Sequence, residues 1–505
     1  MKKTVNIISR SSTLAKIQAE MVGSAISNKH PHISLNYILT KTSGDVNQNL
    51  DISKSLTMGV FTSDISDQVV NKEDSIAVHS WKDFPIEDNK KTNIYGTLKR
   101  ADMRDMLFLK TELKNLKYID ELIIMTSSPR RRYALKNNLA DLIPISFGKI
   151  SFIDVRGNID TRLNKFMKDK AHGIVVAKAA IDRILEYEKI NNISTSPIQT
   201  CLKASQWMVL PLSLFPSAPA QGAIGIEVAN KNHSLIDLVQ SINEKETFDN
   251  VVNERKIMSK YGGGCSQKIG VSIWVKNNLK IKSINGLTED GEVLEDFTTI
   301  STRLRVPDSS KTTIRSNAFP VAQSEKNIFS RRFLDKNTQI GKIKDSIFYI
   351  TRKTVLKNKP AFAHSCILIT SGIKTWRESV RRGYWINGST DSMGQSELDQ
   401  LELITKRKDV IKLSFKDNSS KKTDTIDLYE LKDPNFPDDF EKREEYFWMS
   451  SFAFSVALER YPAIINKRHA SGMGNTYKKI KKLIGQNHDI TPYLSYEHWL
   501  KSLKD

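Results

Sequence analysis

Short apolar runs alternate with helical patterns along the first half of the chain. Residues 4–8 form an apolar run typical of a buried strand, and the apolar spacing over 14–26 predicts a helix after it. The same order recurs at 122–125, which a helical pattern at 130–137 follows, and again from 173–177 onward. Strands that alternate with helices in this way predict an α/β fold with parallel or mixed sheets.

The pattern changes toward the middle of the chain. A helix is expected over 247–261, and it ends at three consecutive glycines, Gly262-Gly263-Gly264. Beyond them, alternating apolar and polar runs are separated by turn residues such as Asn277-Asn278. These runs predict three antiparallel strands, at 269–275, 279–285 and 292–300. A small α+β domain is therefore expected here.

The rest of the chain divides into a polar stretch and a second region of strands and helices. Residues 303–344 are polar and irregular and predict a linker. An α/β region is expected over 345–505. Within it, 446–451 predicts a strand ending in small hydroxyl residues, and 469–477 predicts a strand, a glycine-rich turn and the start of a helix.

Composition adds a strong positive charge to this picture. The 505 residues are 39% hydrophobic and 27% charged, which suits buried cores in about three domains. The formal net charge of +20 implies an anionic partner, and nucleic acid, an acidic membrane surface and a polycarboxylate small molecule all fit it. A solvated basic surface without any partner fits it as well.

Cysteine usage and the apolar runs bear on where the protein works. Cys201, Cys265 and Cys366 are far apart and form no CxxC pair, which favours a reducing compartment over a disulfide framework. The apolar run at 5–8 is too short for a signal peptide, and no run approaches the length of a membrane span. A cytoplasmic protein is the expectation.

A lysine–aspartate pair follows the apolar run at 75–78. Lys82 and Asp83 are expected at the carboxyl end of that strand, where ligands of α/β sheets usually bind. A carboxylate beside a cation can exchange a proton and stabilise a developing positive charge. A simple surface ion pair is the alternative.

Arginine and serine residues gather at three other strand-to-helix junctions. Backbone N–H groups at a helix start bind anions, and guanidinium groups bind carboxylates in pairs. Several loops that each supply arginine suit a small ligand with many carboxylates better than a DNA groove, although a basic surface or nucleic-acid contact stays open. The junctions carry Arg10 and Ser12, then Ser127, Ser128, Arg130 and Arg131, then Arg156 and Arg162.

Cys265 follows the three glycines directly. A thiolate is the nucleophilic form of cysteine, and a glycine-rich turn would expose it. No histidine can be assigned to it as a partner, so the pattern favours covalent attachment of a group over hydrolysis. An isolated cysteine in a loop is the ordinary alternative.

Together and in this order, the motifs resemble those of the porphobilinogen deaminases, also called hydroxymethylbilane synthases. The resemblance covers about residues 4–300. Its segments are RSSTLAKIQ at 10–18, AVHSWKDFP at 77–85, RADMRD at 100–105, TSSPRR at 126–131, VRGNIDTRL at 155–163, APAQGAIGIE at 218–227, Glu254-Arg255, and GGGCS at 262–266.

The resemblance implies a fold and a cofactor. Two doubly wound domains like those of periplasmic binding proteins would span 1–99 with about 218–242, and 100–217. A small cofactor-carrying α+β domain would span 243–302. The active site would lie between the first two domains, and Cys265 would hold a dipyrromethane cofactor through a thioether.

The resemblance also implies roles for single residues, and it implies no metal ion. Asp83, with Lys82 beside it, would assist the loss of ammonia from porphobilinogen and stabilise the cation that results. Cofactor contacts would come from Arg10, Ser12, Ser127, Ser128, Arg130, Arg131 and Arg156. Substrate contacts would come from Phe61, Arg104, Arg162, Arg183 and Gln221.

Some positions depart from the family pattern. Met58-Gly59-Val60 stands where the family has Gly-Lys-Gly, and Ser63 replaces a lysine of the same loop. Ala180 and Ala220 each replace a frequent glycine. These changes leave the catalytic core intact and alter the loop that would grip the growing polymer.

The motifs at 446–451 and 469–477 resemble the second half of uroporphyrinogen-III synthase, in which backbone amides at such turns hold the carboxylates of the product. That enzyme closes hydroxymethylbilane with inversion of one ring. The region is short for the family, and its first half, around 367–395, matches weakly. A structural or docking domain is the alternative.

The expected partners are porphobilinogen and the growing pyrrole chain, with downstream tetrapyrrole enzymes as further candidates. A monomer without nucleic-acid or membrane partners is expected. Two other classes stay open. If the protein were a non-catalytic anion-binding module, the Gly-Gly-Gly-Cys turn would have no function. If it bound nucleic acid, Asp83 would be unexplained.

Overall fold

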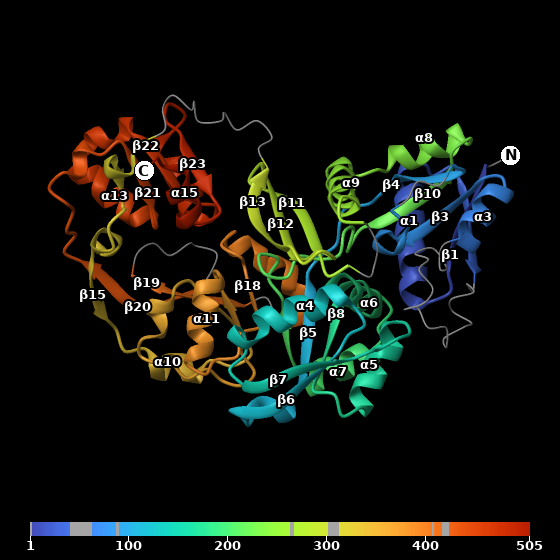
Figure 1. Ribbon diagram of the computed structural model, residues 1–505, viewed down its shortest axis with the longest axis horizontal. Helices are drawn as coiled ribbons and strands as arrows, with labels where there is room; N and C mark the ends of the chain where they lie inside the picture. Colours follow the sequence, from blue (N-terminus) through green and yellow to red (C-terminus); the bar gives the residue numbers. More distant parts are fainter. Residues whose placement is uncertain are drawn as a thin grey trace. The chain divides into compact units, whose positions relative to one another are not determined.

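The computed structural model describes residues 3–40, 63–86, 90–262, 267–300, 313–406, 409–416 and 424–504. The chain divides into two compact units (Figure 1). The first comprises Met1–Ala140, Ile145–Trp274 and Ile281–Phe297, and the second Asp141–Pro144, Val275–Lys280 and Thr298–Asp505.

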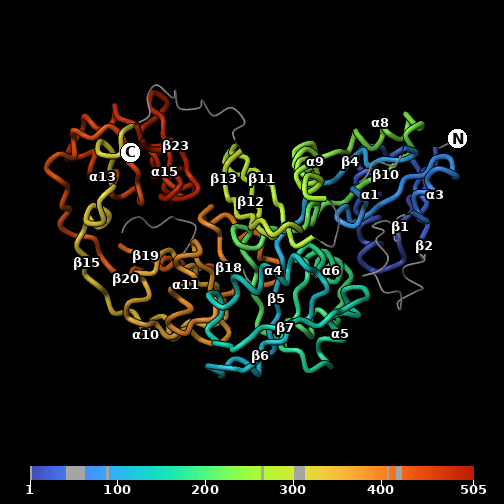
Figure 2. Tube along the Cα trace, viewed as in Figure 1, coloured from blue at the N-terminus to red at the C-terminus, as the bar shows by residue number. Residues whose placement is uncertain are grey.

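The first sheet of unit 1 is mixed, with the strand order β2-β1-β3-β10-β4. Strand β1 pairs in parallel with β2 and β3, whereas β10 runs antiparallel between β3 and β4. Figure 2 shows the green trace of β10 among the blue strands of the N-terminal segment. The bounds are β1 Thr4–Arg10, β2 Ser34–Thr40, β3 Ser75–Ser80, β4 Thr92–Gly96 and β10 Ile224–Ala229.

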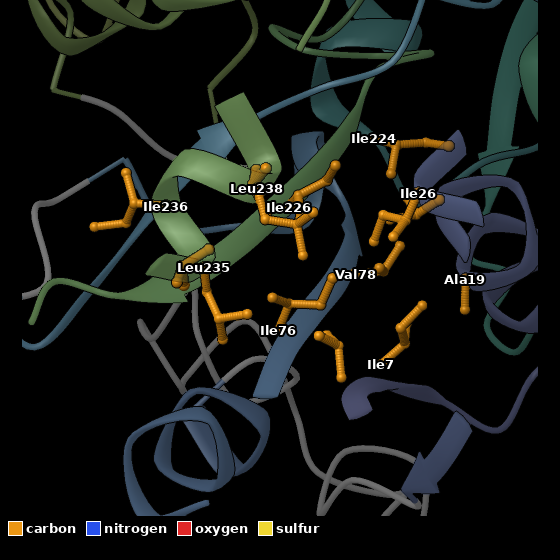
Figure 3. Packing of buried hydrophobic residues seen from close by; sticks show 14 residues of the cluster. Ile7, Ala19, Ile26, Ile76, Val78, Ile224, Ile226, Leu235, Ile236 and Leu238 are labelled. Carbon is orange, nitrogen blue, oxygen red and sulfur yellow. The ribbon is translucent and has the colours of Figure 1, made fainter. Parts of the chain in front are cut away.

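The core of this sheet lies between its strands and two helices, α1 (Thr13–Lys29) and α8 (His233–Ser241). Ile7, Ile76 and Ile226 on the strands pack with Ile26 and Leu235 on the helices (Figure 3). All are buried, and such side chains contribute roughly 1.5–3 kcal/mol each when fully removed from water. This packing fixes the strand ends from which the site is built.

The second sheet of unit 1 has the order β7-β6-β8-β5-β9. Strand β6 is parallel to β7 and β8, and β5 is antiparallel to β8 and β9. Four helices connect or follow these strands: α4 Pro129–Asn138, α5 Ile159–Lys168, α6 Lys178–Ile190 and α7 Pro197–Ala204. The strands are β5 Asp105–Lys110, β6 Tyr118–Met125, β7 Ser146–Ile153, β8 Gly173–Ala177 and β9 Ser205–Val209.

A helix and a three-stranded sheet lie at the expected place in the sequence, mostly within unit 1, while the hairpin Val275–Lys280 and the end of β13 are assigned to unit 2. Helix α9 (Lys245–Ser259) precedes a sheet of order β11-β12-β13. Asn277 and Asn278 both have positive φ, as a two-residue hairpin turn between β11 and β12 requires. The strands are β11 Gly270–Lys276, β12 Leu279–Leu287 and β13 Val293–Ile300, close to the expected positions.

Unit 2 contains two further sheets. One has the order β15-β20-β19-β16-β17-β18 and the other, entirely parallel, the order β14-β21-β22-β23. The first comprises β15 Ser330–Phe333, β16 Ile347–Ile350, β17 Ile367–Thr370, β18 Gly388–Ser389, β19 Val410–Phe415 and β20 Asp424–Lys432. The second comprises β14 Ala318–Phe319, β21 Glu445–Trp448, β22 Arg468–Gly472 and β23 Ile490–Tyr493.

Helices follow the strands of unit 2 as they do in unit 1. The longer ones are α11 Ile373–Arg381, α13 Ser451–Arg460, α14 Asn475–Ile484 and α15 Tyr496–Ser502. The predicted strand ending in hydroxyl residues is β21, and Ser450 after it caps α13 by accepting from the N–H of Ala453. The predicted strand, glycine turn and helix at 469–477 is confirmed as β22 followed by α14.

The prediction of a linker at 303–344 is wrong for the part that the structure describes. Strand β14 pairs with β21, and β15 pairs with β20, so both belong to the sheets of unit 2. Ala318 and Phe319 are buried, and a short helix, α10 (Asn337–Lys342), follows. Strands of two and four residues are too short to show alternation, so the polar residues around them dominated the pattern.

The predicted alternation of strands and helices is confirmed as a mixed α/β architecture. Helices pack on the sheets of both units, and the antiparallel members, β10, β5 and β15, make the sheets mixed. None of the helices within the described ranges is both long and apolar enough to cross a membrane.

Candidate functional site

A short helical turn, Trp81–Asp83, presents the predicted lysine–aspartate pair at the end of β3. Trp81 is buried, Lys82 is half-buried and Asp83 is exposed. Just before the turn, His79 lies 2.7 Å from Glu227 of β10, and both side chains are buried. The sheet core therefore anchors a turn whose carboxylate faces outward.

Charged groups from both sheets of unit 1 act on this turn. Burial lowers the pKa of the Lys82 ammonium, the carboxylates of Asp83 and Asp105 oppose the change, and the guanidinium groups of Arg131 and Arg162 add to it. Burial also lowers the pKa of Arg162, with the positive charges of Arg131 and Arg10 acting in the same direction and Asp83 opposing. The predicted residues therefore form one electrostatic cluster in which cations predominate.

Arg130 and Arg131 share one carboxylate. Asp105 lies 2.8 Å from the guanidinium of Arg130 and 2.7 Å from that of Arg131, and it accepts a hydrogen bond of 2.9 Å from Gln221. The two guanidinium groups and the amide of Gln221 hold the pKa of Asp105 well below its usual range despite its burial. Asp105 is thus an ionised anchor that orients both arginines.

The same arginines keep donors unused. The buried Nε atoms of Arg130 and Arg131 have no hydrogen-bond partner among the described residues, and neither has Oε1 of Gln221. Buried donors are normally paired. A cluster in which cations predominate fits a ligand with carboxylate groups, which is the chemistry of the dipyrromethane that the sequence implies.

The serines at this junction hold the backbone. Ser128 caps α4 by accepting from the N–H of Arg131 at 3.4 Å. The hydroxyl of Ser127 donates to the carbonyl oxygen of Val155 and accepts from its N–H, at 3.0 and 2.9 Å. These bonds tie the junction after β6 to the junction after β7.

The other predicted arginines divide into two kinds. Arg156 is exposed, and Arg162 donates to the carbonyl oxygen of Gly157 at 2.7 Å near the cluster described above. Arg104 instead forms a buried ion pair of 2.6 Å with Asp102, and Arg183 is buried and donates to the carbonyl oxygen of Gly222 at 2.7 Å. The structure thus places Arg104 and Arg183 in internal networks rather than in the cluster.

At the first junction, Arg10 is the last residue of β1, and Ser12 caps α1. The hydroxyl of Ser12 accepts a hydrogen bond of 3.4 Å from the N–H of Ala15. Phe61, Cys265 and the Met58-Gly59-Val60 departure lie outside the described residues. Ser63 begins helix α3 (Ser63–Asn71).

The described cysteines differ from the predicted nucleophile. Cys201 is buried on α7, and burial raises the pKa of its thiol to about 12. Cys366 is partly exposed and donates to the carbonyl oxygen of Ile343 at 3.4 Å. A thiol with so high a pKa forms almost no thiolate at neutral pH, so Cys201 is an inert core residue.

Glu254 of α9 is a structural residue that the sequence did not reveal. It is fully buried, and its carboxylate pairs with both terminal nitrogens of Arg100 at 2.7 and 2.8 Å. It also accepts from the N–H groups of Ala220 at 2.8 Å and Ile273 at 2.6 Å. The motifs contain Arg100 and Glu254, but pairs so distant in sequence carry no local signal. The pairing of Asp105 with its distant partners also has no local signal in the sequence.

The structure thus defines the class: a mixed α/β protein with an exposed carboxylate in a cluster of cations. The family model described as "Porphobilinogen deaminase, dipyromethane cofactor binding domain" matches residues 5–237. The porphobilinogen deaminase of Clostridioides difficile (strain 630) is 33% identical over 267 residues, which are 52% of this chain and 80% of that protein. The chain belongs to the porphobilinogen deaminase family and carries its dipyrromethane cofactor domain.

Other relatives agree. The porphobilinogen deaminase of Clostridium novyi (strain NT) is 31% identical over 290 residues, covering 56% of this chain and 88% of that protein. Among solved structures, the periplasmic sulfonate-binding protein SsuA from Methylobacillus flagellatus matches with a TM-score of 0.26 and 10% identity, covering 50% of this chain and 68% of its own. A similarity that low adds nothing to the description of the fold.

Proposed function

We propose that the chain is a hydroxymethylbilane synthase that joins four porphobilinogen molecules into a linear tetrapyrrole and releases ammonia at each step. The cluster around Asp83 carries this proposal. One exposed carboxylate, flanked by Lys82, Arg131 and Arg162, suits a reaction that creates a single cation on a substrate rich in carboxylates. We further propose that it works as a cytoplasmic monomer.

Each group in the cluster has a role in this chemistry. Asp83 donates a proton to the leaving amino group and then stabilises the positive charge on the pyrrole. Arg130 and Arg131, oriented by Asp105, bind acetate and propionate groups. Arg10, Arg156 and Arg162 extend the row of cations, and Lys82 supports Asp83. Phe61 would line the same site.

The dipyrromethane cofactor supplies the free pyrrole position at which the chain grows, and it keeps the product attached between rounds. Cys265 would hold it through a thioether, and hydrolysis would release hydroxymethylbilane. The inert Cys201 supports Cys265 as the attachment point, since a thiolate is needed. The domain limits proposed for this enzyme are 1–99 with about 218–242, 100–217, and 243–302.

The first experiment is an intact mass with a peptide map on protein purified from cells that make porphobilinogen. A dipyrromethane-sized increment on the Cys265 peptide is expected. It should be absent in Cys265→Ser and retained in the matched control Cys366→Ser. An unmodified Cys265 that neither porphobilinogen nor preuroporphyrinogen can load would contradict the proposal and favour a non-catalytic anion-binding protein.

For unit 2 we propose uroporphyrinogen-III synthase activity, with a non-catalytic structural role as the second candidate. Helices α11 and α14 start at Gly372 and Gly474, without a side-chain cap, after β17 and β22. Free N–H groups at helix starts bind carboxylates. The loop after β18 also meets the start of α14, because a Cβ on Gly394 would lie 3.2 Å from the Cα of Gly474. Arg352 donates to the carbonyl oxygen of Met449 at 2.6 Å.

Product analysis separates these two candidates. The full-length protein, supplied with porphobilinogen, should yield uroporphyrinogen with one ring inverted if unit 2 cyclises hydroxymethylbilane. Product consisting of the uninverted isomer alone would leave unit 2 with a structural role. Either result leaves the deaminase proposal intact, because both isomers derive from hydroxymethylbilane.

A further inference from the structure

Helix α9 carries two adjacent charged residues that hold different parts of unit 1. Glu254 binds Arg100 and two backbone N–H groups, as described above. Arg255, half-buried, turns its guanidinium toward the segment after β3. It donates to the carbonyl oxygens of Trp81 at 3.5 Å, Phe84 at 3.0 Å and Pro85.

The three carbonyl oxygens bracket Lys82 and Asp83. A guanidinium is planar and presents its N–H donors in a fixed fork, so it can hold acceptors spread over two terminal nitrogens, whereas the donors of an ammonium all lie on one nitrogen. The turn also packs on the same helix through Trp81, whose ring lies 5.2 Å from that of Phe248. Helix α9 therefore supports the segment through the guanidinium of Arg255 and through apolar packing, in which Val251 shares a buried cluster with Trp81 and Phe84.

The contacts from the first sheet and α1 to this segment lie before and after Asp83. Ser80 and Gln18 exchange hydrogen bonds of 2.9 and 3.1 Å, and the ring of His79 lies 5.3 Å from that of Phe84. These contacts hold the two ends of the turn. Within it, the N–H of Phe84 donates to the carbonyl oxygen of Trp81 at 3.1 Å. For the carbonyl oxygens of Phe84 and Pro85, the donor is Arg255.

We propose that Arg255 is a positioning residue for the reaction. It fixes the Trp81–Pro85 segment to α9, the helix that precedes Cys265 in the sequence. In this way it holds the Asp83 carboxylate at a fixed position relative to α9. The inference rests on the proposed function for its catalytic consequence. Its structural consequence is independent of that function. Without the guanidinium, the segment keeps its ring contacts and the N–H bonds of Trp81 and Phe84, but it loses the three bonds that tie its carbonyl oxygens to α9.

The test compares Arg255→Gln with Arg255→Lys and with Lys256→Gln, a matched control that removes an exposed positive charge from the next position of the same helix. Arg255→Gln should keep the covalent cofactor by intact mass and lower kcat by about 10- to 100-fold with KM nearly unchanged, as expected when a reacting group is misplaced by about 1 Å. Arg255→Lys should recover part of kcat, and Lys256→Gln should match the wild type.

A second measurement needs no activity. Hydrogen exchange of the peptide spanning residues 79–86 should accelerate in Arg255→Gln and stay unchanged in Lys256→Gln, while exchange in β1 and β10 is unaltered. Unchanged exchange at 79–86, or wild-type kcat in holo Arg255→Gln, overturns the inference. If the wild-type protein consumes no porphobilinogen, the proposed function fails, and the exchange comparison still decides whether Arg255 orders the turn.

Discussion

Two charge centres in unit 1 differ in how completely they are satisfied. At Glu254, both carboxylate oxygens are used by Arg100 and by two backbone N–H groups. Around Lys82 and Asp83, cations predominate, and the Nε atoms of Arg130 and Arg131 have no partner in the described part of the chain. Opposite charges are matched at Glu254, whereas positive charge is in excess around Asp83, which is the arrangement that the proposed polycarboxylate ligand would need.

Glu254→Gln should have the largest effect on stability. The amide puts donors against the guanidinium of Arg100 and leaves that cation buried without its counter-charge. Breaking a buried pair of this kind costs about 3–5 kcal/mol in the free energy of unfolding. Urea denaturation followed by circular dichroism measures it. A loss below 1 kcal/mol would show that solvent or another carboxylate takes over the pairing.

Asp83→Asn should leave the stability nearly unchanged and reduce the activity strongly. The side chain is exposed, so the free energy of unfolding should change by less than about 0.5 kcal/mol. Turnover of porphobilinogen should fall about 10²- to 10⁴-fold, the usual contribution of a positioned acid or base. Steady-state assays on cofactor-loaded protein check this, and undiminished turnover would remove Asp83 from the mechanism.

Asp182 gives an intermediate case, buried like Glu254 but incompletely paired. Its Oδ2 lies 2.6 Å from Lys178, and its Oδ1 has no partner among the residues described. Burial raises the pKa of Asp182 to about 6. The folded protein therefore holds the proton longer than the unfolded chain, so this group's contribution to stability falls as the pH rises from about 4 to 6.

Asp182→Asn removes that titration. The variant should exceed the wild type in unfolding free energy by about 1–3 kcal/mol above pH 6, with the gap closing below pH 4. Denaturation curves across this pH range test the sign directly. A variant less stable than the wild type at pH 7 would mean that the charged pair with Lys178 outweighs the burial of the carboxylate.

Ala220→Gly should have the smallest effect. Ala220 has a φ of +64° and is buried beside Glu254, and a left-handed conformation costs a residue with a Cβ about 1–2 kcal/mol. The entropy of glycine in the unfolded chain offsets part of the gain, so stabilisation of about 0.5–1 kcal/mol is expected. Thermal unfolding checks it.

The sequence predicted local features well. Asn277-Asn278 marked a hairpin because both residues adopt positive φ readily, and Ser128 before Pro129 marked the start of α4. It could not reveal the pairing of Asp105 with Arg130, Arg131 and Gln221, because those residues are distant in sequence and meet only when the second sheet has formed and the chain has returned to it at 221. Arg104 and Arg183 were grouped with the ligand-binding arginines since no sequence pattern distinguishes an internally paired guanidinium.

Strand β10 has a consequence for how the chain acquires its structure on the ribosome. Among the described strands, β4 pairs only with β10, which lies beyond the whole second sheet in sequence. During synthesis, β4 therefore emerges without a partner and must wait while the second sheet is made. Because contacts that span long loops form slowly, the second sheet should complete first and the N-terminal sheet last. A nascent chain that has emerged from the ribosome only as far as residue 223 would carry a finished second sheet and an N-terminal segment open to chaperones.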